Sequence, residues 1–330
     1  MNRSLPEITV IIPNYNGRQV LPACLDSLAR QLLPPAAVIV VDNGSQDDSR
    51  ALVEGHPLRP RWIGFDHNRG FAAAVNAGIR AAQTPALALL NNDAAADPRW
   101  LLAGARGLLR HLQAAIFASL MLRREERDRV DSAGDAYTRD GRPRPRGRSR
   151  RAADFERVCE TFSASAGAAF FRRRLFEEVG PFDESFFAYL EDVDLGFRSR
   201  LLGHRCLFLP EAVVYHQGAA TQLGDRPGPR PEESGQRVRW IARNKIFVLG
   251  QNLPARLLFA WAPDIADGLI RSAAYHLLYS RQFPAFVAGT LEGLFGLPRR
   301  CSRRRALQAR RQISLAELKR MILLGAWPCP

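Results

Sequence analysis

Several common functional signatures are missing from this sequence of 330 residues. Neither G-x-G-x-x-G nor G-x-x-x-x-G-K-[ST] occurs, so the usual fingerprints of dinucleotide-binding folds and P-loop nucleotide sites are absent. Its apolar runs are shorter than the about 20 residues that cross a bilayer, and no transmembrane helix is predicted. The five cysteines are scattered and include no C-x-x-C pair, which argues against a zinc site and a disulfide framework and suits a reducing compartment.

Lysine is almost absent as well. Only Lys245 and Lys319 occur, so arginine carries nearly all the positive charge of a chain with a formal net charge of +14. Such a charge is compatible with a nucleic-acid-binding protein, which is one alternative. However, the sequence contains no aromatic-interleaved basic motif of the RRM kind and no zinc finger, so contact with phosphates or a membrane explains the charge better. No nucleic acid is expected as a partner.

The first part of the chain alternates between strand-like and helix-like segments. Compact apolar runs predict strands at 8–13, 37–42, 61–65 and 86–93. Segments typical of helices lie at 18–32, 45–55, 70–83 and 97–112. Strands bounded this closely by helices predict an α/β fold with a parallel sheet that is covered on both faces.

Beyond residue 120 the pattern changes. Residues 121–151 are highly charged, contain Gly and Pro, and predict an exposed basic loop. Regular structure returns in 152–220, where 206–210 and 212–216 predict two strands. Residues 221–330 predict a helical, basic C-terminal region. Its apolar patches beside clustered arginines fit either a helix lying on an anionic membrane surface or helices packed on the preceding domain with a solvated basic face.

Three polar stretches follow predicted strands, namely "PNYNG", "DNGSQDD" and "NND". In parallel α/β sheets, ligands bind at the carboxyl ends of the strands. Asp42 could there accept a hydrogen bond from a base or ribose, and Asp93 could bind a hard divalent cation through oxygen. Each stretch taken alone is typical of turns, and it is their common placement that favours a nucleotide site.

The stretch "YLEDVDLGFRSRLLG", from Tyr189 to Gly203, places Glu191, Asp192 and Asp194 within four positions. Acids at the start of a helix are stabilised by the helix dipole, so they need no catalytic role. The same acids could also form a carboxylate set that activates a hydroxyl group. The stretch by itself leaves both interpretations open.

Taken together, "VIIPNYNG", "VIVVDNGSQDDS", "NRGFAAAVNAGI", "LLNNDAAADPRWL", "SAGAAFFRRRLFEEVGPFDESFFAYLEDVDLGFR" and "VVYHQG" resemble the ordered motifs of family 2 glycosyltransferases, and most closely those of bacterial rhamnosyltransferase-like members. The resemblance covers Ile8 to about Gly218. It implies a GT-A fold, a Rossmann-like mixed sheet with helices on both faces. The catalytic domain would be 1–220, with a nucleotide-sugar half in 1–120 and an acceptor and base half in 152–220, followed by the helical region 221–330.

The resemblance also implies roles for individual residues. Donor-binding residues would be Pro13, Tyr15, Asn16, Asp42, Asn43, Gly70, Asn76, Asn91 and Asn92. Asp42 would read the pyrimidine N–H, and Gly70 and Asn76 would border the sugar diphosphate. "NND" stands where the family has D-x-D, so Asp93 would bind Mg²⁺ or Mn²⁺, with His216 approaching from the other side. Asp192 would be the general base, with Glu191 beside it.

The implied activity is inverting transfer of a sugar from a nucleotide donor, with dTDP-rhamnose or a UDP-sugar as plausible donors. The acceptor would be a hydroxyl of a glycan or a lipid-linked sugar in cell-envelope polysaccharide synthesis, such as O-antigen assembly. The enzyme would be cytoplasmic and peripheral on the inner face of the cell membrane. An alternative comes from "QRVRW", Gln236–Trp240, which fits the Q-x-x-R-W of processive polysaccharide synthases. Those enzymes carry transmembrane helices, whereas none is predicted here, so a chance match on a helix is favoured.

Overall fold

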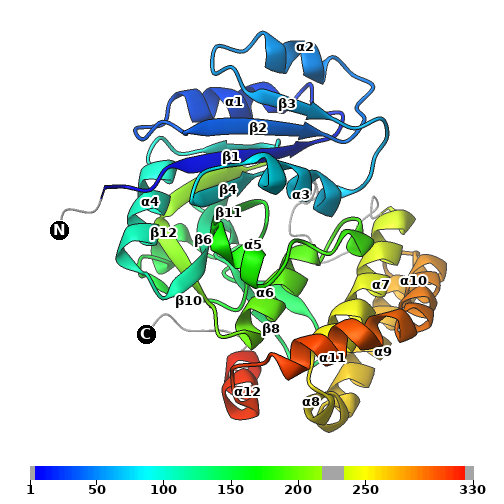
Figure 1. The fold of residues 1–330 in the computed structure, drawn as a ribbon. Helices are drawn as coiled ribbons and strands as arrows, with labels where there is room; N and C mark the ends of the chain where they lie inside the picture. Colours follow the sequence, from blue (N-terminus) through cyan, green and yellow to red (C-terminus); the bar gives the residue numbers. More distant parts are fainter. Residues whose placement is uncertain (1–3, 218–233, 324–330) are drawn as a thin grey trace.

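The computed structural model describes residues 4–217 and 234–323 (Figure 1). Among these residues, one sheet contains ten strands in the order β10-β12-β6-β11-β4-β1-β2-β3, with β5 paired to β12 and β7 paired to β6. The strands are β1 (Ile8–Asn14), β2 (Ala37–Asp42), β3 (Arg61–Gly64), β4 (Ala86–Leu90), β5 (Ala94–Ala96), β6 (Ala114–Arg123), β7 (Val130–Ser132), β10 (Cys159–Glu160), β11 (Ala168–Arg172) and β12 (Arg205–His216).

The sheet is mixed, as the family resemblance implies. The run β3-β2-β1-β4 is parallel, in agreement with the alternation of strands and helices in the sequence. Next to it, β11 pairs antiparallel with both β4 and β6, which makes the sheet mixed beyond the four strands for which the residue pattern predicts parallel pairing. The apolar run of β11 does not encode its direction, which is decided by the path of the chain after β6.

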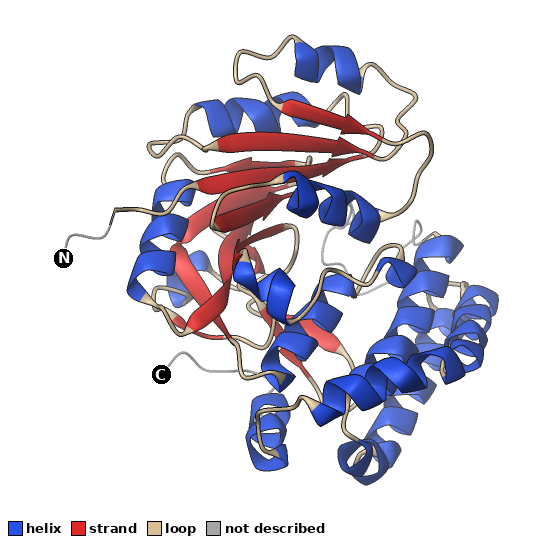
Figure 2. Ribbon diagram, viewed as in Figure 1, coloured by secondary structure: helices blue, strands red, loops and turns tan. Residues whose placement is uncertain are grey.

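Helices cover both faces of the sheet (Figure 2). One face packs against α1 (Leu21–Ala29), α2 (Ser49–Glu54) and α4 (Trp100–Arg110), and the other against α3 (Phe71–Ala81), α5 (Arg174–Glu178) and α6 (Glu191–Leu201). Strand β1 is buried along its whole length, and its residues alternate between the two apolar cores. Its continuous apolar run is therefore the pattern of a central strand.

The segment 121–151 is not the exposed loop that its charge predicts. It adds β7 to the sheet and forms a hairpin of β8 (Asp135–Tyr137) and β9 (Pro143–Pro145). Val130, Ala133 and Tyr137 are buried, and so is Arg146, which donates to the carbonyl of Ala133 at 3.0 Å. Few apolar residues are enough to bury this segment because neighbouring elements supply most of the packing surface.

The C-terminal helices form a second lobe at the lower right of Figure 1. They are α7 (Gly235–Asn252), α8 (Ala255–Ala260), α9 (Ala262–Leu278), α10 (Phe283–Gly296), α11 (Cys301–Ala309) and α12 (Leu315–Leu323). A shared apolar core joins Phe186, Val193 and Phe197 of the first lobe to Phe247 and Leu249 of α7. The predicted boundary at 220/221 lies outside the described residues.

Three further findings concern the sequence predictions. The two strands expected at 206–210 and 212–216 are one strand, β12, with an irregularity between Leu209 and Val213. No described helix is both long and apolar enough to cross a membrane. Cys24, Cys206 and Cys301 carry free thiols, as the scattered spacing predicts, whereas Cys159 is disulfide-bonded, which that spacing does not predict.

Candidate active site

Asp42 lies at the carboxyl end of β2, where its side chain organises the neighbouring loop. Its Oδ1 accepts from Nδ2 of Asn14 at 2.8 Å and from the hydroxyl of Ser45 at 2.5 Å, and its Oδ2 accepts from the backbone N–H of Ser45 at 2.8 Å. The hydroxyl of Ser45 in turn accepts from the N–H of Asn16 at 2.7 Å. These bonds tie the ends of β1 and β2 together, because the two strands are parallel neighbours that finish at the same edge.

A cavity of about 340 Å³ opens beside this loop and is lined by Asp42, Ser45, Asp47, Arg50, Trp62, Gly64, Phe65 and Asp66. Aromatic walls with a few converging polar groups are typical of sites for flat heteroaromatic ligands. Of the other predicted donor residues, Tyr15 is half exposed at the rim of the same strand edge, and Pro13 is buried within β1.

Asn43 and Gly70 lie together. The side chain of Asn43 is buried, donates to the carbonyl of Gly70 at 3.0 Å and accepts from the N–H of Arg69 at 3.1 Å. Gly70 has a φ of +91°, and a Cβ there would lie 2.5 Å from the carbonyl oxygen of Phe187. Only glycine fits this position, where the turn before α3 touches the loop that leads into α6.

The "NND" stretch spans the turn between β4 and β5. Asn92 donates to Oδ1 of Asn14 at 2.8 Å and so joins the same hydrogen-bond network as Asp42. The Oδ1 of Asn91 is buried and has no hydrogen-bond partner among the described residues. An acceptor atom left in this state has a desolvation cost that a bound donor group would remove.

Asp93 lies beside His216 because β5 and β12 are antiparallel and His216 pairs with Ala94. The Nε2 of His216 is 3.2 Å from Oδ1 of Asp93, and its Nδ1 is 2.9 Å from Oδ2 of Asp131 on β7. Burial opposes protonation of this imidazole, but the two carboxylates outweigh burial and raise the pKa of His216 to about 10.

The residues around Asp93 and His216 supply only part of the ligand set of a divalent cation. Asp93 and His216 offer one oxygen and one nitrogen ligand that face each other, and the described residues contain no group of three or more potential ligands. A two-ligand site suits a cation whose remaining positions are filled by phosphate oxygens and water, as is usual for Mg²⁺. His216 would have to lose its proton before it could ligate a metal.

The loop before α6 is strained and firmly held. Phe187, Tyr189 and Leu190 all have positive φ angles, of 64°, 70° and 67°, which non-glycine residues rarely adopt. Asn244 of α7 donates its amide hydrogens to the carbonyls of Phe186, Ala188 and Tyr189 at 2.7–3.0 Å. Backbone strain of this kind persists only where the surroundings over-determine it, and it gathers at functional sites.

The "QRVRW" stretch lies in α7 against the same loop. The ring of Trp240 packs on those of Phe187 and Tyr189, with centroid distances of 4.7 and 6.3 Å, and the guanidinium of Arg237 lies over Tyr189 at 5.3 Å. The stretch therefore packs against the loop that leads into α6.

Asp192 occupies the first turn of α6, where Oδ2 accepts from the N–H of Ala166 at 3.0 Å and Oδ1 accepts from the N–H of Val193 at 2.8 Å. Burial raises the pKa of Asp192, and the backbone N–H groups oppose that rise only in part. Glu191 is almost completely buried, and its Oε2 has no hydrogen-bond partner among the described residues. Burial, together with the charge of Asp192, raises the pKa of Glu191 well above its ordinary value.

Asp135, at the start of β8, belongs to the same acidic group. Burial and the charge of Asp192 raise its pKa well above the ordinary value, against a hydrogen bond of 3.3 Å from the hydroxyl of Ser163. Three carboxyl groups in one buried region cannot all be ionised, since each charge raises the pKa of the others. Asp192 is the most accessible of the three and accepts from two backbone N–H groups, and its pKa is the least raised.

Asp194 has a structural place. It is fully buried, and its Oδ2 accepts from Nε of Arg198 at 2.8 Å. Its Oδ1 accepts from Nδ2 of Asn252 at 2.7 Å and from the side chain of Gln251. The carboxylate thus joins α6 to the end of α7.

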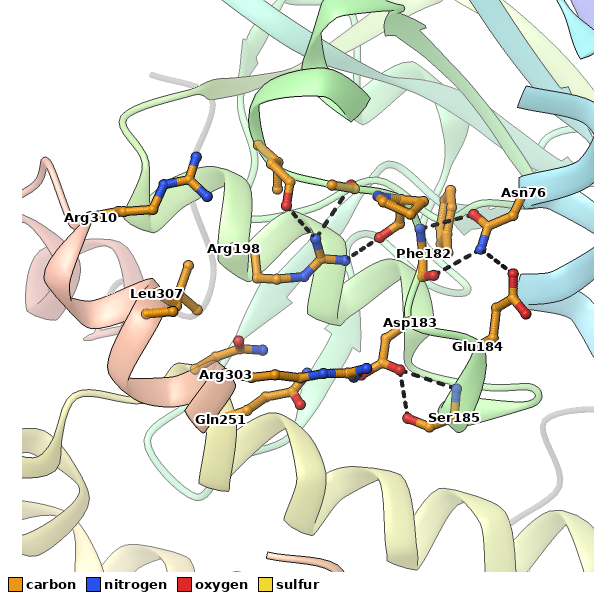
Figure 3. A pocket seen from close by; sticks show the side chains of 15 residues that line it. Asn76, Phe182, Asp183, Glu184, Ser185, Arg198, Gln251, Arg303, Leu307 and Arg310 are labelled. Atoms are coloured by element: carbon orange, nitrogen blue, oxygen red, sulfur yellow. Dashed lines mark hydrogen bonds and ion pairs between the residues drawn. The ribbon is translucent and has the colours of Figure 1, made fainter. Parts of the chain in front are cut away.

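Asn76 of α3 is engaged by the segment around Phe182. Its amide donates to the carbonyl of Phe182 and to Glu184 and accepts from the N–H of Phe182, at 2.9–3.0 Å (Figure 3). It lines a separate cavity of about 570 Å³ between residues 179–185, α6 and α11, which none of Asp42, Asp93 or Asp192 lines. Asn76 therefore holds the 182–184 segment in the structure, and its role beside the sugar diphosphate stays a prediction.

Three residues with clear positions in the site escape sequence reasoning, namely Asp131, Asp135 and Asn244. The first two belong to the segment whose charge predicts an exposed loop. A signal was present in "VDSAGDAY", in which Asp131 and Asp135 alternate with small and apolar residues as they do in strands. Nothing in the sequence pairs Asn244 with residues more than fifty positions earlier.

Comparison with known proteins gives consistent findings. A family model described as "Glycosyl transferase family 2" matches residues 9–180. The N-acetylglucosaminyl-diphospho-decaprenol L-rhamnosyltransferase of Mycobacterium tuberculosis is 29% identical over 242 residues, which cover 64% of this chain and 76% of that protein. An uncharacterized glycosyltransferase of Bacillus subtilis is 33% identical over 91 residues, and the match spans only 26% of its length and 27% of this chain.

Among solved structures, a mannosyltransferase of Pyrobaculum calidifontis in complex with GDP-Man and Mn²⁺ has a TM-score of 0.55 at 19% sequence identity. The superposition covers 93% of this chain and 85% of the mannosyltransferase. At this level of identity, the likeness concerns the fold.

Proposed function

The chain belongs to glycosyltransferase family 2 and has the GT-A fold, and from this premise we propose that it is an inverting enzyme that transfers one sugar from a nucleoside diphosphate to an acceptor hydroxyl. The observation that supports the proposal most directly is the meeting of two sets of side chains. Asp42, Asn92 and Asp93 lie at the carboxyl edge of the sheet, and Asp192 begins the helix that faces it across the turn at Gly70. Glycosyl transfer needs both a donor site and a base.

In the proposed reaction, Asp192 removes the proton of the acceptor hydroxyl as that oxygen attacks the anomeric carbon. The bond between the anomeric carbon and the phosphate oxygen breaks, and the nucleoside diphosphate leaves with the bonding electrons. Attack opposite the leaving group inverts the configuration. The raised pKa values of Glu191 and Asp135 favour their neutral forms, which would leave Asp192 as the proton acceptor.

On the donor side, the base would enter the cavity beside Asp42, and the diphosphate would lie over Asn91, Asn92 and Asp93. A divalent cation held by Asp93 and His216 would offset the negative charge of the departing diphosphate. Asp131 would keep the ring of His216 in one orientation through its bond to Nδ1. Solved relatives of this fold contain Mn²⁺, which supports a metal requirement here.

The acceptor is proposed to be a glycan or a lipid-linked sugar of the cell envelope, by analogy with the mycobacterial relative, which is named for a decaprenol-linked substrate. The donor is proposed to be dTDP-rhamnose or a UDP-sugar. The proposed location is the inner face of the cell membrane, where a lipid-linked acceptor would be available. These finer assignments rest on the likeness to relatives and on the basic C-terminal lobe.

The proposal is tested by measuring binding and slow hydrolysis of donors with the purified protein. A panel of UDP-, dTDP- and GDP-sugars, each with Mn²⁺ or Mg²⁺, is followed by calorimetry and by release of the free nucleoside diphosphate. We expect one donor to bind with a Kd in the range of about 1 µM to 1 mM and Asp42→Ala to weaken it at least about tenfold. If no nucleotide sugar binds under any of these conditions, the proposed function is wrong.

A second measurement addresses Asp131, which the sequence did not single out. Asp131→Asn removes the carboxylate that holds Nδ1 of His216, and loss of such a partner usually lowers affinity or activity about 10- to 100-fold. We expect donor affinity in the presence of Mn²⁺ to fall within that range. Asp128→Asn, at an exposed carboxylate three residues earlier, is the matched control and should bind donor normally. Equal affinity for both variants would contradict the role of Asp131.

A further inference from the structure

Helix α10 packs glycines against α7 and exposes large apolar side chains, which is the reverse of the arrangement in an ordinary surface helix. Gly289 and Gly293 face α7, where a Cβ on Gly289 would lie 2.1 Å from the carbonyl oxygen of Arg239. The opposite face of α10 carries only apolar residues at helical spacing, namely Pro284, Val287, Ala288, Leu291, Leu294 and Phe295. Leu291, Leu294 and Phe295 are exposed, and the ring of Phe295 is 79% accessible. Phe286 and Val287 pack beside Val238 and Ala242 of α7, but burial against α7 does not explain the exposed Leu291, Leu294 and Phe295.

Helix α9 continues the apolar surface. It contacts α10, with the rings of His276 and Phe286 5.3 Å apart. Its exposed residues at helical spacing include Ala266, Ile270, Ala274 and Leu277. Asp267 and Arg271, the charged residues on its outer side, pair with each other at 2.7 Å. Exposed apolar residues gathered on neighbouring helices mark a surface that contacts a protein or a membrane.

The charge of the same lobe favours an anionic partner. Residues 234–323 contain sixteen Lys and Arg but only four Asp and Glu, so they contribute +12 of the formal net charge of +14. Exposed arginines lie within four positions of the exposed apolar side chains, with Arg256 before Phe259, Arg281 after Leu277 and Arg299 after Phe295. An apolar face rimmed by arginine is the pattern of a helix at the boundary of an anionic bilayer.

A groove beside α8 adds a place for phosphate groups. It has a volume of about 520 Å³ and is lined by Arg256 from α8, by Arg304, Arg305 and Gln308 from α11, and by Arg311 and Leu315 beyond α11. No acidic residue lines it within the described part of the chain, and no ion pair of these four arginines is found there. Guanidinium groups gathered without acids bind phosphate well, since their planar forks match its oxygens.

We propose that the outer faces of α9 and α10, together with this arginine groove, dock the enzyme on a membrane that contains anionic phospholipid. This surface rests on the proposed location of the enzyme at a membrane and gives that location a structural basis. Phe259, Leu291, Leu294 and Phe295 enter the boundary between head groups and acyl chains, and the arginines contact lipid phosphates. Docking would hold the candidate active site close to an acceptor that is itself anchored in lipid.

The proposal is tested by sedimentation of the full chain with vesicles of phosphatidylcholine alone or of phosphatidylcholine with phosphatidylglycerol. We expect binding to the vesicles with phosphatidylglycerol and a decrease as salt is raised. Leu291→Ser combined with Phe295→Ser should weaken that binding at least about tenfold, because both side chains lose a favourable transfer from water. Arg256→Gln combined with Arg305→Gln should weaken it several-fold, and free inorganic phosphate should compete only weakly.

Leu32→Ser is the matched control, since Leu32 is 65% exposed and lies between α1 and β2, outside the C-terminal helices. The Leu32→Ser variant should bind vesicles as the unmodified chain does. Thermal unfolding identifies any variant that fails to fold, and donor binding without vesicles reports separately on the proposed function. Equal vesicle binding by all variants would overturn the proposal. So would a dimer in solution that the Leu291→Ser and Phe295→Ser pair dissociates, because the apolar face would then be the contact between two copies.

Discussion

Replacing Asp192 by Asn is expected to lower the rate of sugar transfer by about 10²- to 10⁴-fold while donor binding changes little. The amide has nearly the same shape as the carboxylate, so α6 and its strained entry loop keep their place. It cannot accept the proton of the acceptor hydroxyl. Rates are measured by release of nucleoside diphosphate in the presence of acceptor, and donor affinity is measured by calorimetry. A loss of donor binding instead of rate would assign Asp192 to the donor site.

The pH dependence gives a second readout of the same group. Burial raises the pKa of Asp192 above 3.8, and the base acts only when deprotonated. The rate is therefore full above the raised pKa and is lost as the pH falls through it. Asp26→Asn, at a half-exposed carboxylate of α1, is the control. It should keep both the rate and the loss of rate at low pH. If Asp192→Asn kept most of the rate and still lost it as the pH falls, another group would be the base.

The second large effect concerns stability. Asp194→Ala is expected to lower the free energy of unfolding by about 3–5 kcal/mol, because it leaves the partly buried guanidinium of Arg198 without its carboxylate and leaves two buried amides without their acceptor. The measurement is denaturation by urea, followed by circular dichroism and by tryptophan fluorescence. Since Asp194 connects α6 to α7, the two lobes should lose their mutual support together.

The chain offers a matched control for this prediction in Asp267, which pairs with Arg271 at the same spacing of four residues but is 57% exposed. Asp267→Ala should cost no more than about 1 kcal/mol, since exposed pairs of this kind are screened by water. If both variants lowered the free energy of unfolding by similar amounts, burial would not be the reason why the Asp194 contacts stabilise the protein. Asp194→Asn keeps the size of the side chain, and its decrease in the free energy of unfolding should lie between those of the two alanine variants.

Much of the structure of residues 8–93 follows from the sequence. The apolar runs of β1, β2 and β4 and the helices between them can be predicted because their signals are local: burial on both faces demands continuous apolar residues, and helical spacing marks the covering helices. The ends of parallel strands meet at one edge, so the proximity of Asp42 and Asn92 also follows. The motif order around Asp192 and His216 likewise indicated the family.

Other features were decided by tertiary structure alone. The charged segment with Asp131 and Asp135 became a buried part of the site because β6 and β12 provide its surroundings, which local composition does not reveal. The motif around Asn76 predicts a donor-binding residue, yet its side-chain amide forms hydrogen bonds with the backbone of Phe182, more than a hundred positions later. The contacts of Asn244 and Asp194 likewise join α7 to the loop and helix that carry Asp192, the proposed base. Local patterns record which surfaces of a segment are apolar, whereas the partners of a buried polar group depend on which distant segments the completed fold places beside it.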